Sequence, residues 1–100
     1  MEHLLGRSLM SRPLFPLGQV VATRGVAAHL ERHRISAFLY LDRHAHGDWG
    51  SVPAEDARAN HRAVVHGTRI LSSYDLAGKY VWIITEADRR MTTLLFPSEY

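Results

Sequence analysis

Ionisable side chains gather in residues 44–50, a short polar segment between two apolar stretches of the chain. His44, His46 and Asp48 are the groups in it that can carry chemistry, because imidazole titrates near neutral pH and both group types bind metal ions. Two glycines and a tryptophan complete the segment, which is typical of a shaped loop. No motif in it has a fixed chemical meaning, so the segment predicts a site but not its reaction.

The groups that RNA cleavage requires also occur in this chain. A metal-independent ribonuclease needs a base and an acid for proton transfer, together with cations that hold the phosphate. The architectural similarity of the chain to barnase and RelE-like ribonucleases implies that His44 and Glu86 transfer the protons and that Arg69 and Arg89 contact the phosphate. Alternation along a strand at residues 79–86 directs Glu86 toward the edge of an apolar face, where burial would raise its pKa.

Each of these charged residues also has a structural interpretation, which stays open at this stage. Glu86 is close enough in sequence to Arg89 for an ion pair at the turn of a hairpin. Arg69 can form an ion pair with Asp48 or with Asp75 and so attach the polar loop to a sheet. In that interpretation these residues belong to the scaffold and touch no substrate.

The second half of the polar segment, Gly47, Asp48, Trp49 and Gly50, is expected to be a rigid structural loop. Trp49 supplies a large apolar side chain that can anchor the loop in a core. Asn60 is polar on an otherwise apolar helix face, so we expect its amide to satisfy backbone groups of the same loop.

We expect neither a metal ion nor a small-molecule cofactor. His44, His46 and Asp48 offer at most three ligands, and the chain has no cysteine to complete a zinc site. One hundred residues form one core of ordinary size and leave no room for a separate cofactor-binding domain.

The amino-acid composition limits the classes of protein to which this chain can belong. The chain is 46% hydrophobic and 22% charged, which is typical of a folded domain, and it contains no apolar run of about 20 residues that would cross a membrane. The absence of cysteine suits a cytoplasmic protein. Eleven of the twelve cations are arginine, which binds phosphate well, but the net charge of +2 is too small to establish a nucleic-acid partner by itself.

Charge and turn residues divide the chain into expected elements. Residues 1–34 carry five arginines against two glutamates, whereas residues 35–100 carry seven cations against eight carboxylates. We expect residues 1–10 to form a flexible extension and residues 11–100 to form a single α+β domain. The apolar run over 37–41 fits a helix or a buried strand equally well. The expected order is a strand over 17–22, then two or three helices, over 23–34, 53–66 and, if it is helical, 36–44, and a three-stranded antiparallel meander over 69–75, 79–86 and 91–96.

Several of these segments resemble a known family. Members are small uncharacterised proteins of bacterial plasmids and integrative elements, often labelled as the M subunit of a type I restriction enzyme. That label does not suit this chain, which lacks the glycine-rich and Asn-Pro-Pro-Tyr-type motifs of a methyltransferase. The resemblance implies a mobile genetic element and favours a helix over 36–44. It rests on residues 11–22, 44–50, 60, 69–74, 81–89 and 92–100.

Two hypotheses about function follow. The order of helices before an antiparallel meander is similar to that of barnase and RelE-like ribonucleases, so the first is a nucleic-acid-related accessory protein, in its sharpest form a compact ribonuclease. The second is a non-catalytic interaction or adaptor protein in which the Gly-Asp-Trp-Gly loop is structural. Across these two hypotheses, the expected partner is RNA or another protein. We expect any oligomer to form through the last strand, which ends near the C-terminus and can offer an open edge.

Overall fold

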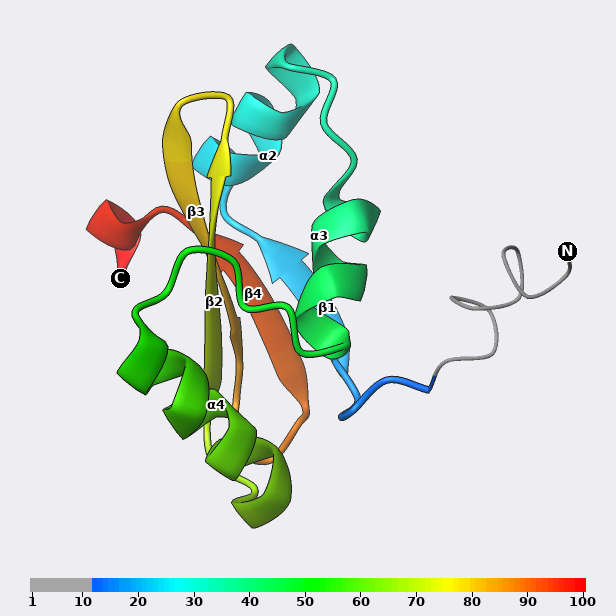
Figure 1. Cartoon of the computed structure of the whole chain (residues 1–100). Helices are drawn as coiled ribbons and strands as arrows, with labels where there is room; N and C mark the ends of the chain where they lie inside the picture. Colours follow the sequence, from blue (N-terminus) through cyan, green and yellow to red (C-terminus); the bar gives the residue numbers. More distant parts are fainter. Residues whose placement is uncertain (1–11) are drawn as a thin grey trace, which may run out of the picture.

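The computed structural model of this chain describes residues 12–100 and has an α+β fold, as the sequence predicted (Figure 1). The extension expected over residues 1–10 lies outside the described residues. Among residues 12–100, no helix combines the length and the apolar character that crossing a membrane requires. The elements are β1 (Gln19–Ala22), α2 (Arg24–Arg32), α3 (Ala37–Ala45), α4 (Ala54–His66), β2 (Ile70–Leu76), β3 (Lys79–Thr85), β4 (Met91–Leu95) and the short 3-10 helix η1 (Pro97–Glu99).

The four strands form one mixed sheet in the order β1-β4-β3-β2. Strands β2, β3 and β4 form the predicted antiparallel meander, whereas β1 is parallel to β4. Three helices separate β1 from the meander in sequence, so the chain returns to lie beside β1 only with its last strand (Figure 1). As a result β4 is an inner strand with both edges paired, and the expectation that it offers an open edge is wrong.

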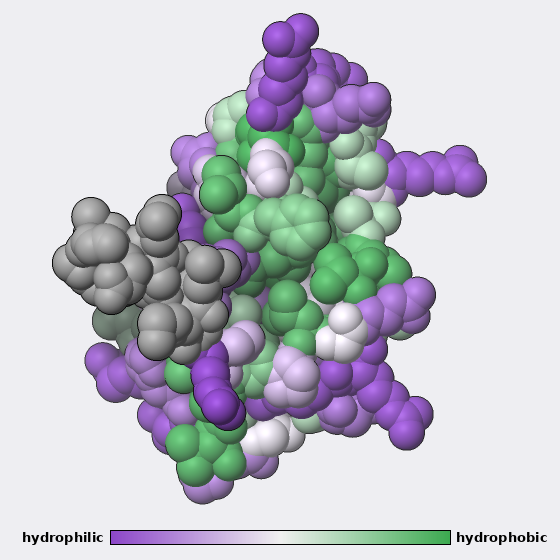
Figure 2. Space-filling view, turned by 90° about the vertical axis from the view of Figure 1, so that its right-hand side faces the viewer, coloured by the Kyte–Doolittle hydropathy of each residue, from purple (hydrophilic) through white to green (hydrophobic). Residues whose placement is uncertain are grey.

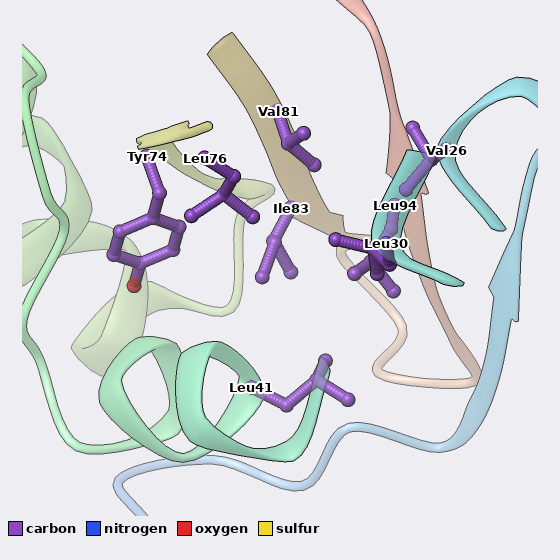
Figure 3. Packing of buried hydrophobic residues seen from close by; sticks show 8 residues of the cluster. All are labelled: Val26, Leu30, Leu41, Tyr74, Leu76, Val81, Ile83 and Leu94. Atoms are coloured by element: carbon purple, nitrogen blue, oxygen red, sulfur yellow. The ribbon is translucent and has the colours of Figure 1, made fainter. Parts of the chain in front are cut away.

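The main core lies between the sheet and its helices (Figure 3). Ile83 of β3 is opposite Leu94 of β4, and both side chains are buried against the helices. Helix α2 contributes Val26 and Leu30 to this core, and α3 contributes Leu41. Each such side chain contributes roughly 1.5–3 kcal/mol when it leaves water, so this face of the sheet fixes how the helices are placed.

The ends of the helices follow from local chemistry. Thr23 caps α2, because its hydroxyl oxygen accepts a hydrogen bond from the Val26 N–H at 3.2 Å. Gly67 ends α4 in the left-handed conformation, with φ of 73°. The ambiguous run over 37–41 is part of helix α3, which buries Leu41 and leaves Phe38 81% exposed.

Candidate functional site

His44 lies near the end of α3 with no exposed surface and forms the centre of a buried polar chain. Its Nδ1 is 2.6 Å from the hydroxyl of Ser72, and its Nε2 is 2.9 Å from that of Thr85. Thr85 in turn bonds Thr92 at 2.7 Å, and the Thr92 hydroxyl donates to the Leu17 carbonyl at 2.7 Å. The chain of hydrogen bonds therefore joins α3, the strands β2, β3 and β4, and the segment before β1.

The direction of each hydrogen bond in this chain follows from counting protons. A hydroxyl has one proton, so Thr92, which donates to Leu17, must accept from Thr85. Thr85 must then accept from the Nε2–H of His44, which leaves Nδ1 to accept from Ser72. That last step requires a neutral ring: burial, assisted by the positive charge of Arg89, lowers the pKa of His44 to about 4, so the imidazole is neutral near pH 7 and both of its nitrogens are bonded.

This placement does not provide the accessible base that the ribonuclease hypothesis needs. A general base must come within hydrogen-bond reach of the proton that it takes, directly or through one water. His44, Ser72 and Thr85 are all 0% exposed, and both ring nitrogens are already bonded. The structure therefore places His44 in the interior, where it hydrogen-bonds β2 and β3, and not in the loop site that we expected.

Arg89, one of the two expected phosphate ligands, bonds backbone carbonyls. Its guanidinium donates to the carbonyl of Ala63 at 2.9 Å and to that of Thr68 at 2.7 Å, and it lies 5.4 Å from the centre of the Phe15 ring. The Ala63 carbonyl also accepts from the Gly67 N–H at 2.8 Å, so Arg89 adds a bond to a carbonyl already used at the end of α4 and connects it to Thr68. Its contact with Glu86 is to the main-chain oxygen at 3.1 Å, and no ion pair between the two side chains occurs within residues 12–100.

Arg69 and Glu86 lie apart from the His44 chain. Arg69 donates to the Tyr100 hydroxyl, and its guanidinium lies 5.2 Å from that ring. The Tyr100 ring also packs edge-on against Trp82, on the face of the sheet opposite the helices. Glu86 is exposed just after β3. Of the four expected residues, Arg89 is near enough for its charge to act on His44 and bonds the Glu86 carbonyl, whereas Arg69 bonds Tyr100. The expected ion pair of Arg69 with Asp48 or Asp75 is wrong.

The Gly-Asp-Trp-Gly loop is held by bonds to its own backbone and to α3. Asp48 accepts from Arg43 at 2.7 Å, and this hydrogen bond holds the pKa of the Asp48 carboxyl below its usual range. The Tyr74 hydroxyl donates to the Asp48 carbonyl at 2.5 Å. Gly50 has φ of 75°, and a Cβ there would overlap the backbone of Ser73, so only glycine fits.

Trp49 places the loop in a second, smaller core. The indole is 4% exposed, is stacked 6.3 Å from Phe15, and packs edge-on against His44 and His61. Its Nε1 is buried and has no hydrogen-bond partner among residues 12–100. The residue is therefore a packing anchor, and its position brings the loop backbone against β2.

Together, the loop and Asn60 cover the outer edge of β2. The Asn60 amide bonds both backbone groups of Leu71, at 2.8 and 3.2 Å, so it acts as a neighbouring strand would. Ser73 makes the next pair of bonds, to the Trp49 carbonyl at 3.0 Å and from the Ser51 N–H at 2.7 Å. Asn60 thus bonds the strand and not the loop, which corrects the expectation from sequence.

The other edge of the sheet, at β1, is open. The N–H groups of Gln19 and Thr23 donate to carbonyls next to and within β4, at 2.9 and 3.0 Å. Alternate residues of a parallel strand bond the same neighbour, so Val20 and Ala22 point their N–H and C=O groups away from the sheet. No hydrogen bond to these outward groups is present in the part of the chain that the structure describes.

An apolar groove lies beside this open edge. It has a volume of about 250 Å³ and runs between residues 13–17, β1 and α3; we call it the β1–α3 groove. Figure 2 shows apolar side chains gathered on this face of the molecule. Phe38 and Val20 are 81% and 42% exposed at its margin. Its lining includes Pro13, Pro16, Leu17, Val20, Phe38 and Leu41.

Sequence reasoning missed this surface, although a signal was present. The run over 37–41 has five apolar residues in succession, which is more than one buried helix face can hold. Some of these side chains had to be exposed once α3 formed. The groove also contains little charge: Asp42 and His46 are its charged or titratable lining groups, and they lie 3.3 Å apart.

Comparison of the chain with protein-family models, with curated proteins and with solved structures finds no match. The resemblance to proteins of plasmids and integrative elements therefore stays a prediction. Within residues 12–100, no group of three or more histidine or carboxylate side chains is arranged to hold a metal ion. The open edge and the β1–α3 groove lie side by side and together are suited to binding an extended segment.

Proposed function

We propose that this chain is a non-catalytic protein-interaction domain that binds an extended segment of a protein partner at β1. The observation that carries the proposal is an unpaired strand edge next to an exposed apolar groove. Proteins that bind peptides by adding a strand use main-chain hydrogen bonds for affinity and side-chain pockets for selectivity. Here the edge of β1 supplies the main-chain groups, and the adjacent β1–α3 groove supplies the side-chain pocket.

The register of β1 predicts how such a segment would lie. Val20 is opposite Thr92, whose side chain is buried on the helix-bearing face, so the Val20 side chain faces the same side. Every second side chain of an added strand would therefore lie against α3, near Phe38. The alternate side chains would continue the other face of the sheet and stay in water.

The hypothesis of nucleic-acid cleavage has less support in the geometry. Of the four residues that we assigned to it, His44 is enclosed, and Arg69 and Arg89 are bonded to groups of the chain itself. By contrast, the open edge needs only a partner strand. The interaction hypothesis thus relies on the unpaired backbone groups of β1, which are present on the described surface.

A peptide library displayed on phage tests the proposal. We expect the purified chain to select peptides with alternating apolar residues, and calorimetry with a synthetic selected peptide to show saturable binding. Phe38→Asp should weaken that binding at least about tenfold, because it places a charge in the apolar contact.

Val65→Asp is the matched control, since Val65 is 77% exposed on α4 and is not part of the groove lining. It should bind the peptide as the wild-type chain does. Equal loss of peptide binding in both variants would contradict the proposal.

A further inference from the structure

We infer that the partner at the β1–α3 groove is a second copy of this chain, paired through β1 about a two-fold axis. The inference rests on the proposed function and names the occupant of the same site. Its basis is the difference between the two sheet edges. Because Asn60 and the Trp49–Ser51 backbone already bond the edge of β2, strand addition between copies can use only β1 against β1. Such a contact closes on itself and does not extend into a fibre.

The hydrogen-bond pattern of β1 limits the registers that this pairing can take, and we propose the one with Val21 on the two-fold axis. Residues with outward groups must be opposite one another in an antiparallel pair, where each residue exchanges both of its bonds. Val20 of one copy then pairs with Ala22 of the second copy, and Ala22 with Val20. Val21 stands on the two-fold axis opposite Val21 of the second copy. The two sheets would become one continuous sheet.

The groove suits a second copy in its shape and its charge. Pairing about the axis brings the exposed Val20 side chains and the two α3 helices together, so that Phe38 leaves water on both sides at once. The groove is lined by one carboxylate, that of Asp42, which lies 3.3 Å from His46, so a second copy meets no block of like charge.

The face is also large enough for a stable dimer. Such interfaces bury about 800 Å² on each partner. The folded chain measures 34 × 34 × 26 Å, so an interface of that size takes up most of one face. The groove on this face includes the exposed side chains of Val20 and Phe38, and Figure 2 shows apolar side chains gathered there.

Sedimentation of the full chain over about 1 µM to about 1 mM tests whether it pairs. We expect the mass to rise from that of one chain, 11.3 kDa, to twice this value. Phe38→Asp should weaken pairing at least about tenfold. Val20→Pro should do the same, because it removes an N–H that no bond within one copy uses. Val65→Asp should pair as the wild type does.

A cysteine cross-link tests the register. The natural chain has no cysteine, so Val21→Cys introduces a single thiol. Directly opposed residues that do not share hydrogen bonds have Cα atoms about 4.5 Å apart, within disulfide range. We expect rapid disulfide-linked dimers on mild oxidation. Gln19→Cys is the control, because its two copies would be about 13 Å apart and should not link.

Each remaining outcome would overturn the inference in a recognisable way. A one-chain mass at every concentration, with selected peptides still binding in a manner that requires Phe38, would reject self-pairing and leave the proposed function intact. A dimer that survives both Phe38→Asp and Val20→Pro, or that links equally through Gln19→Cys, would place the interface elsewhere. Neither dimer nor peptide binding would reject both.

Discussion

The two edges of this sheet are treated in opposite ways. At β2, an asparagine side chain and a loop backbone take the place of a neighbouring strand, so that Leu71 and Ser73 have bonded outward groups. At β1, the equivalent groups of Val20 and Ala22 point outward beside an apolar groove. Open edges invite unwanted pairing, and proteins cover those that have no use. Our proposal that a partner binds the β1 edge rests on this difference.

Removing the cover of β2 should have the largest effect on stability. Gly50→Ala places a Cβ into the backbone of Ser73 at a positive φ, so the loop must leave the strand. We expect a loss of roughly 4 kcal/mol or more in the free energy of unfolding, or no folded protein, because overlap, strain and the lost strand bonds combine.

Gly78→Ala separates backbone strain from overlap in that experiment. Gly78 also has a positive φ, of 84°, but a Cβ there would meet nothing within 4 Å. This variant should lose only about 1 kcal/mol in urea unfolding. Similar losses in both variants would mean that the contact of Gly50 with β2 contributes little.

Acid should destabilise the fold through His44, the buried imidazole that joins α3 to the sheet. His44 has an ordinary pKa of 6.5 when unfolded and about 4 when folded, so the unfolded chain binds its proton first as the pH falls. The contribution of His44 to the free energy of unfolding is therefore complete above about pH 6.5. It decreases toward pH 4, by up to about 3 kcal/mol.

Urea unfolding at several pH values between 7 and 4 measures this effect. His44→Gln should be less stable at pH 7, because it cannot reproduce both hydroxyl contacts, but it should lose the part of the slope that belongs to the imidazole. An unchanged slope in His44→Gln would show that other groups cause the acid sensitivity.

Asn60→Ala uncovers the β2 edge at Leu71, while the Trp49–Ser51 backbone still bonds Ser73. It leaves the N–H and C=O of Leu71 without their partner, which costs about 2 kcal/mol of stability. We also expect concentration-dependent assemblies larger than a dimer, seen by light scattering, because the uncovered part of β2 at Leu71 can then pair as well as β1.

Arg62→Ala, an exposed neighbour on α4, is the control and should change neither stability nor assembly size. If Asn60→Ala assembles no further than the wild type does, the asparagine is a stabilising contact and not a guard of the edge.

Much of the fold could be predicted because its signals are local. The turn at Ala77 and Gly78 and the alternation on either side identified β2 and β3, and the Thr23 cap and the Gly67 stop identified helix ends. The parallel contact of β1 with β4 is not local, since three helices intervene, and no sequence pattern indicated it. The wrong prediction about the last strand follows from this.

The candidate site was harder to predict because it depends on register. A histidine after an apolar run looks the same whether it lines a cleft or lies in the interior. The hydroxyls of Ser72, Thr85 and Thr92 could have indicated a buried partner for His44, but only once the strand register had placed them on one face. Asn60 likewise required knowledge of which backbone groups it faced.

Hydrogen exchange of single backbone amides, followed by NMR in dilute and in concentrated protein, tests the central claim most directly. We predict that the Leu71 and Ser73 amides are protected at every concentration, whereas those of Val20 and Ala22 exchange quickly in dilute protein and become protected when the chain is concentrated. Val20 and Ala22 amides that are as protected as that of Ser73 in the most dilute sample would show that the β1 edge is already closed, and would contradict the account.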